Sequence, residues 1–190
     1  MISAAVLAVG CARQTSEQDR DKSVLQSILE GVLAADVDEV ICITDDLAQA
    51  RHEIKLNDRR LFWHLNTAAS RGQSSSVIAG LWASHPRSDG VMFVDCEPPV
   101  VGTALINAMI EKFKTSVASI VAATFAGQPH GALLFRRELF AEILELRGDD
   151  TGASVLEKHT RNTALVPWRE QPEAVIANRR AIPAHLKERL

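Results

Sequence analysis

The sequence predicts an α/β fold in three layers, with a doubly wound and mostly parallel sheet between two layers of helices. Short apolar runs, rich in β-branched residues, alternate along the chain with segments whose apolar residues recur every three or four positions. Strands and helices that alternate in this way form parallel sheets covered on both faces. The 190 residues, 46% hydrophobic and 24% charged, have the proportions of one globular domain.

The first half of the chain contains two strand–helix cycles and the strand that follows them. An apolar run at 4–9 ends at Gly10 and predicts a buried strand, and the helical spacing over 23–35 predicts an amphipathic helix. A β-branched strand at 40–43 is followed by aspartates that can cap a helix over 47–54. The run at 61–65 predicts a third strand.

The alternation continues in the second half. Ser74 to Ser76 are predicted to cap a helix that runs through Val77, Ile78, Leu81 and Trp82, and an Asp-Gly turn leads into a strand at 91–94. A helix at 105–113, strands at 119–124 and 132–135, and a helix at 138–146 complete the predicted elements. The domain is therefore expected to span 1–168. Residues 169–190, which carry two prolines and few periodic apolar residues, are expected to form a loosely packed tail.

Charge and hydropathy exclude two classes of partner. The 21 basic and 24 acidic residues are interspersed and give a net charge of -3, which does not favour nucleic acid or an anionic membrane surface. No run of about 18 apolar residues occurs, so no membrane-spanning helix is expected. The apolar start of the chain is not predicted to be a secretory signal, because no lysine or arginine precedes it. A small-molecule partner is favoured.

The cysteines predict a cytoplasmic, reduced protein. Cys11, Cys42 and Cys96 are odd in number and widely spaced, so neither a disulfide framework nor a zinc site is expected. Cys96 is interpreted as a small buried apolar residue rather than a reactive thiol.

Ligands of a doubly wound sheet bind beyond the carboxyl ends of its strands, which directs attention to the residues that follow each strand. These are Gly10 to Arg13, Thr44 to Asp46, Asn66 with Gly72 to Ser76, and Asp95 to Pro99. Gly10 and Arg13 could bind a phosphate through backbone N–H groups and a cation. Alternatively, Gly10 makes a tight turn and Arg13 is solvated.

Several of these segments, in this order, resemble the nucleotidyltransferase family of molybdenum cofactor maturation, the molybdopterin cytidylyl- and guanylyltransferases. The resemblance runs from about Val6 to Trp168. Its segments are Leu7 to Arg13, Asn66 with 71–81, 89–94 leading into Glu97-Pro98, 127–140, and 146–153. The resemblance implies a Rossmann-like nucleotidyltransferase fold and transfer of a nucleoside monophosphate from CTP or GTP onto a pterin phosphate, with Mg²⁺. It implies nucleotide binding by Gly10, Arg13, Asn66, Gly72, Ser75, Ser76 and Gly80, and a catalytic role for Arg13. Asp95 is expected to be catalytic if it takes the place of the family's metal-binding aspartate.

The sequence departs from that family at three places. The loop between Gly10 and Lys22 is shortened, and one residue is missing before Arg13. Cys96 occupies the position of a metal-binding aspartate, and the family's C-terminal carboxylates have no counterpart near 178–183. Asp95 or Glu97 could hold the metal instead. Otherwise both are turn residues that accept hydrogen bonds from backbone amides.

Two functions follow as expectations. The first is recognition of a nucleotide or pterin phosphate with weak or altered nucleotidyl transfer, the metal carboxylates being absent from their usual places. The alternative is a catalytically inactive accessory or scaffold protein that contacts a molybdoenzyme maturation partner. Ser74 to Ser76 either contact the nucleotide or cap their helix. Phe62, Trp63 and Trp82 are predicted to lie in the core.

Overall fold

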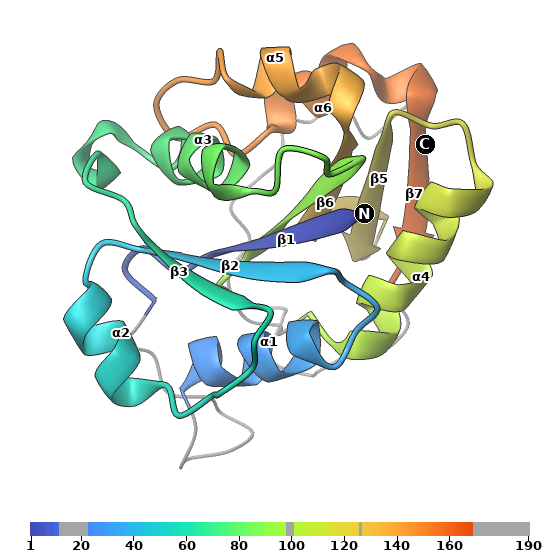
Figure 1. The fold of residues 1–190 in the computed structure, drawn as a ribbon. Coiled ribbons are helices and arrows are strands. Elements are labelled where there is room, and N and C mark those ends of the chain that lie inside the picture. The colour runs from blue at the N-terminus through green and yellow to red at the C-terminus, as the bar shows by residue number, and fades with distance from the viewer. Residues whose placement is uncertain (12–22, 98–100, 126, 169–190) are drawn as a thin grey trace.

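The computed structural model describes residues 1–11, 23–97, 101–125 and 127–168, and it confirms the predicted fold class. A seven-stranded sheet lies between two layers of helices (Figure 1). Its strands are β1 (Ile2–Leu7), β2 (Glu39–Thr44), β3 (Leu61–Leu65), β4 (Gly90–Asp95), β5 (Ile120–Phe125), β6 (Gln128–Arg136) and β7 (Thr163–Pro167).

The strand order places a topological switch point between β1 and β4. The order is β3-β2-β1-β4-β6-β5-β7, and β6 runs antiparallel to both of its neighbours. The chain leaves β1 toward β2 and β3 on one side, then returns to β4 on the other side of β1. Crevices at such points are the usual ligand sites of doubly wound sheets.

The helices cover both faces of the sheet. Their bounds are α1 (Val24–Leu33), α2 (Leu47–Glu53), α3 (Ser74–Ala83), α4 (Thr103–Thr115), α5 (Phe140–Ile143) and α6 (Ala153–Lys158), with short 3₁₀ turns η1 (Ala69–Arg71), η2 (Arg137–Leu139) and η3 (Thr160–Asn162). One apolar core joins α1 and α4 to the sheet, and a second joins α3, α5 and α6 to the opposite face (Figure 1). The Asp46 carboxylate accepts the Gln49 N–H at 2.9 Å, so the predicted cap of α2 is confirmed.

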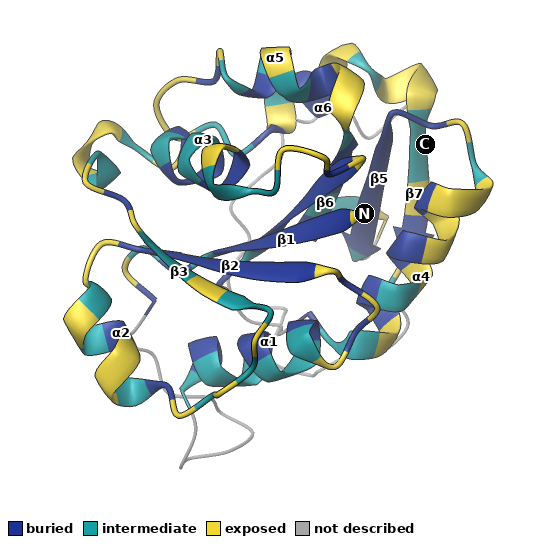
Figure 2. Ribbon diagram, in the orientation of Figure 1, coloured by how far each residue is buried: buried dark blue, intermediate teal, exposed yellow. Residues whose placement is uncertain are grey.

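The central strands are buried on both faces (Figure 2). Along β4, Val91 and Phe93 pack in the core beside α3, whereas Met92 and Val94 pack in the core beside α1 and α4. Because side chains alternate along a strand, Asp95 faces the α3 side of the sheet.

Two predicted elements differ from the structure. The first strand covers Ile2–Leu7 rather than 4–9, because Ala8 begins a turn that the Cys11 N–H closes on the Ala8 carbonyl. The helix predicted over 138–146 is a 3₁₀ turn followed by the single short helix α5. Helix α6 and strand β7 were not predicted; α6 makes fewer than two turns, which is too short to show a helical period.

The prediction that Phe62 and Trp82 lie in the core is wrong. Their exposed fractions are 52% and 73%. Phe62 belongs to the edge strand β3, and Trp82 follows Leu81 around α3 onto the outer face of the helix. Trp63 is partly buried against the core beside α1. Within the described ranges, no helix is long and apolar enough to cross a membrane.

Candidate functional site

A cavity of about 330 Å³ lies at the carboxyl ends of β1 and β4, at the switch point. Its walls come from the residues after β1, the start of α3 with the turn before it, the end of β4, and the loop before α6. They are Leu7, Val9, Gly10, Cys11, Ala69, Gly72, Gln73, Ser76, Asp95, Cys96, Glu97, Asp149 and Thr151. The charged side chains among them are all acidic, so the cavity favours a cation or a ligand that brings one.

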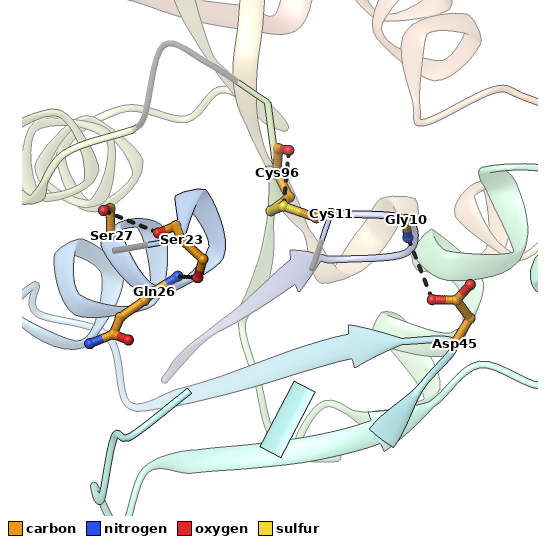
Figure 3. The surroundings of a disulfide bond; sticks show 7 residues. All are labelled: Gly10, Cys11, Ser23, Gln26, Ser27, Asp45 and Cys96. Carbon is orange, nitrogen blue, oxygen red and sulfur yellow. Dashed lines mark hydrogen bonds between the residues drawn. A yellow bond between two sulfur atoms is a disulfide. The ribbon is translucent and has the colours of Figure 1, made fainter. Parts of the chain in front are cut away.

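The turn after β1 forms the first wall. The Cys11 N–H donates to the Ala8 carbonyl at 3.1 Å, and Gly10 adopts the positive φ of 74° that glycine tolerates. The Gly10 N–H points to the Asp45 carboxylate, at 3.5 Å (Figure 3). Both N–H groups therefore already have protein partners. Arg13, which was expected to contact phosphates, lies outside the described residues.

A disulfide bond joins Cys11 to Cys96 across the switch point (Figure 3). The expectation of no disulfide is wrong, although Cys96 is buried as expected. The two cysteines are 85 residues apart in sequence, but β1 and β4 are hydrogen-bonded neighbours and Leu7 is in register with Asp95. The residues just beyond both strand ends are thereby close, with Cα atoms 6.0 Å apart.

Cys42 on β2 is the free cysteine, and it is buried in the sheet. Burial disfavours the thiolate and raises the pKa of the Cys42 thiol to about 12. This thiol is therefore inert at neutral pH.

Asp95 and Glu97 place two carboxylates on the cavity wall. Asp95 is partly buried at the end of β4, and Glu97 is exposed. Burial, and secondly the negative charge of Glu97, raise the pKa of Asp95 to about 6. In the described part of the chain, no cation or hydrogen-bond donor compensates Asp95.

This carboxylate pair fits a magnesium or manganese ion. Mg²⁺ is held in proteins by one or two carboxylates, with water and substrate phosphates completing its shell. Asp95 and Glu97 would supply the carboxylates, and an uncompensated partly buried carboxylate gains from a nearby cation. Cys96 would not contribute, because its sulfur is bonded to Cys11. Among the described residues, no group of three or more metal-ligating side chains occurs, so the pair depends on a ligand's phosphates for the remaining oxygens.

Asn66 is buried, and it organises the start of α3. Its Nδ2 donates to Ser75 Oγ at 2.9 Å and to Ser76 Oγ at 3.0 Å, and its Oδ1 accepts the Ala68 N–H at 3.0 Å. Of the predicted nucleotide-binding residues in this segment, Gly72 and Ser76 line the cavity, whereas Asn66 and Ser75 position the wall from behind. Ser74 to Ser76 were predicted either to cap their helix or to contact the nucleotide. In the structure the Ser75 and Ser76 hydroxyls accept hydrogen bonds from Asn66, which neither prediction included.

The backbone N–H groups at the start of α3 are already bonded. Gln73 N–H donates to Asp149 Oδ1 at 3.4 Å, Ser74 N–H to the Gly148 carbonyl at 2.9 Å, and Ser75 N–H to the Gly72 carbonyl at 3.1 Å. The bonds from Gln73 and Ser74 hold the loop before α6 against the start of α3, and this contact forms one side of the cavity. Gln73 and Thr151 lie in segments that carry the family resemblance, but neither was predicted to bind the ligand; both line the cavity.

Gly80 lies two turns further along α3, against the sheet. A Cβ atom there would come within 2.8 Å of the Ala5 Cβ on β1. The glycine therefore lets α3 approach the sheet closely, and it does not line the cavity.

The raised pKa of Asp95 predicts how stability depends on pH. Between pH 4 and 6 the unfolded chain ionises Asp95 while the folded chain keeps its proton, so the free energy of unfolding falls as pH rises through this range. Wild type should therefore lose about 2 kcal/mol of unfolding free energy between pH 4 and 7, and Asp95→Asn should not, so that the variant is more stable than wild type at pH 7.

Urea unfolding at several pH values between 4 and 7 measures this difference. Asp36→Asn, which neutralises an exposed aspartate outside the cavity, is the matched control and should leave the difference near zero at every pH. If the unfolding free energies of Asp95→Asn and wild type differed by the same amount at every pH in this range, the raised pKa of Asp95 would be contradicted.

Comparisons with known proteins agree with this architecture. The model of the MobA-like NTP transferase domain family matches residues 14–184. A crystal structure of Rv0371c from Mycobacterium tuberculosis superposes with a TM-score of 0.71 at 21% identity, covering 88% of this chain and 87% of that one. A second structure of Rv0371c, a complex with manganese, gives 0.68 at 25% identity, with the same coverage of 88% and 87%.

A similar fold occurs in 4-diphosphocytidyl-2C-methyl-D-erythritol synthase from Anaerococcus prevotii. The TM-score is 0.67 at 17% identity, and the match covers 88% of this chain and 86% of that one. No curated protein matches the sequence.

Proposed function

Because the chain belongs to the MobA-like NTP transferase domain family, we propose that its cavity binds a nucleoside triphosphate together with a divalent cation and transfers the nucleotidyl group to a phosphorylated acceptor. The observation that carries the proposal is the carboxylate pair Asp95 and Glu97 on the wall of a switch-point cavity, where Asp95 has no cation or hydrogen-bond donor beside it among the described residues. We further propose CTP or GTP as the nucleotide, a pterin phosphate as the acceptor, and a cytoplasmic location. The manganese complex of Rv0371c supports a divalent cation.

Each wall of the cavity has a distinct task in this proposal. Asp95 is ionised at neutral pH, since its pKa is about 6, and can hold a cation beside Glu97. A cation bound there neutralises negative charge on phosphoryl oxygens. Gln73 and Ser76 at the start of α3 also line the cavity and can bind the sugar or base. The Gly10 turn also borders the cavity, but in this structure its Gly10 and Cys11 N–H groups are bonded to Asp45 and Ala8.

Replacement of metal carboxylates is compatible with slow transfer. Two carboxylates, those of Asp95 and Glu97, remain at the β4 end, and the disulfide-bonded Cys96 lies between them in the sequence. We therefore propose weak or altered catalysis rather than its complete loss. A catalytically inactive accessory role, with a molybdoenzyme maturation partner, is the outcome if nucleotide binds without turnover.

We expect CTP or GTP to bind only when Mg²⁺ or Mn²⁺ is present, and Asp95→Asn to weaken this cation-dependent binding at least 10-fold, or about 1.4 kcal/mol. Isothermal titration calorimetry of each nucleotide, with and without cation and with and without a dithiol reductant, measures the affinity. At 100 times its dissociation constant, a bound nucleotide should also stabilise the protein by about 2.7 kcal/mol.

Asp36→Asn is again the control, because it removes the same charge outside the cavity and should bind nucleotide like wild type. Silence of every nucleotide in calorimetry and thermal unfolding, in both redox states, would refute the proposed function. Equal cation-dependent binding by wild type and Asp95→Asn would refute only the role of Asp95.

A further inference from the structure

We propose that the Cys11–Cys96 disulfide is a redox-modification site, and that its reduction by a dithiol makes the cavity competent to bind a nucleoside triphosphate. This inference rests on the proposed function, since it concerns the regulation of the same cavity. The bond joins the turn after β1 to the end of β4, so one covalent link connects both strands that border the switch point.

The cysteines lie beside the residues that the proposed function needs. Cys11 follows Gly10 directly, and Cys96 stands between Asp95 and Glu97. Both cysteines line the cavity although little of either is exposed. Their side chains pack in the core beside α1 and α4, and any movement of either cysteine is passed to its neighbours on the cavity wall.

The oxidised turn is poorly arranged for phosphate. Phosphates bind to glycine turns through free backbone N–H groups. Here the Gly10 N–H points to the Asp45 carboxylate (Figure 3), and the Cys11 N–H closes the turn on the Ala8 carbonyl. Because Cys11 is tethered to β4, the turn cannot rotate these donors into the cavity. The Asp45 carboxylate also repels an incoming phosphate.

The reaction balances with a dithiol as the co-reactant. One thiolate of the dithiol attacks one sulfur of the protein disulfide, which breaks the S–S bond, releases the other cysteine as a thiolate and forms a mixed disulfide. The second thiol of the dithiol then attacks the mixed disulfide and releases the remaining cysteine. The protein gains two electrons and two protons and becomes the Cys11 and Cys96 thiols, while the dithiol becomes a disulfide. Cys42 takes no part, because it is fully buried on β2 and does not line the cavity.

The test compares nucleotide binding by fully oxidised and fully reduced protein, with dithiothreitol as the dithiol and the magnesium complexes of CTP and GTP as probes. Thiol counting by alkylation and mass spectrometry should find one thiol before reduction and three after it. We expect the reduced protein to bind at least 10-fold more tightly. Cys11→Ala/Cys96→Ala should bind like the reduced protein whether or not dithiothreitol is present. Cys42→Ala should keep the redox response of wild type.

A second measurement does not depend on nucleotide. Hydrogen exchange of the peptide that contains residues 8–11 should become faster on reduction, while far-UV circular dichroism shows that the protein remains folded. Equal nucleotide affinity in both states overturns the switch and leaves the proposed function intact. Faster exchange without any nucleotide binding supports release of the turn and refutes the proposed function. Unchanged exchange, or unfolding on reduction, shows a purely structural bond and overturns the inference.

Discussion

Loss of the Cys11–Cys96 disulfide is expected to lower the free energy of unfolding by about 2–4 kcal/mol. The bond closes a loop of 85 residues, and a cross-link over so long a loop restricts the unfolded chain strongly. The melting temperature should fall by roughly 5–15 °C for a chain of this size. Urea and thermal unfolding of wild type with and without dithiothreitol, and of Cys11→Ala/Cys96→Ala, measure the effect.

Cys42→Ala separates this effect from a general effect of removing sulfur. It deletes a buried side chain that forms no bond, so its smaller stability loss should be the same with and without dithiothreitol. A wild-type melting temperature that dithiothreitol leaves unchanged, although three thiols become titratable, would contradict the prediction. Lower stability and tighter nucleotide binding in the reduced protein are compatible, because binding energy can then order a released turn.

Gly72→Ala should destabilise the protein by about 3 kcal/mol and disrupt the cavity wall. Gly72 has φ 104° and ψ 173°, a conformation that is essentially restricted to glycine. A Cβ atom at this position would lie 2.3 Å from the Gly148 carbonyl oxygen, which is backbone and cannot turn aside. The loop before α6 must therefore move away from α3, and the Ser74 N–H would lose its bond to Gly148.

Urea unfolding gives the stability loss, and hydrogen exchange of the peptide containing Ser74 reports the broken contact. Gly102→Ala is the matched control, because Gly102 has an ordinary negative φ and open space around the added methyl group. Its effect should stay within about 0.5 kcal/mol. A Gly72→Ala protein as stable as this control would show that the close contact between the two loops is not essential.

Local pattern was sufficient for the elements with strong periodicity. Helix α1 has an apolar stripe of residues such as Leu25, Ile28 and Leu29, and it forms within two residues of its predicted bounds. Strand β3 coincides with its prediction. Helix α6 was not found in this way, since its six residues make fewer than two helical turns and show no helical period, and strand β7 was also not predicted.

Some residues of the candidate site could also be predicted from the sequence, because they follow the ends of predicted strands. Parallel strands bring their carboxyl ends to one edge of the sheet, so Gly10, Asp95 and Glu97 could be named from where their strands end. Which side each residue faces could not be named, because it depends on register. The pairing of β1 with β4 sets that register and places Asp95 on the α3 side.

The sequence by itself determined the α/β class, most strands and helices, and the edge of the sheet where the cavity lies, because these follow from periodicities of two and 3.6 residues. Only the tertiary structure decided that Cys11 bonds to Cys96, that Asn66 supports the wall of the cavity from behind, and that Trp82 is exposed. Each of these depends on which strands become neighbours and how far helices lie from the sheet. Such distances join residues far apart in the chain, and no local pattern encodes them.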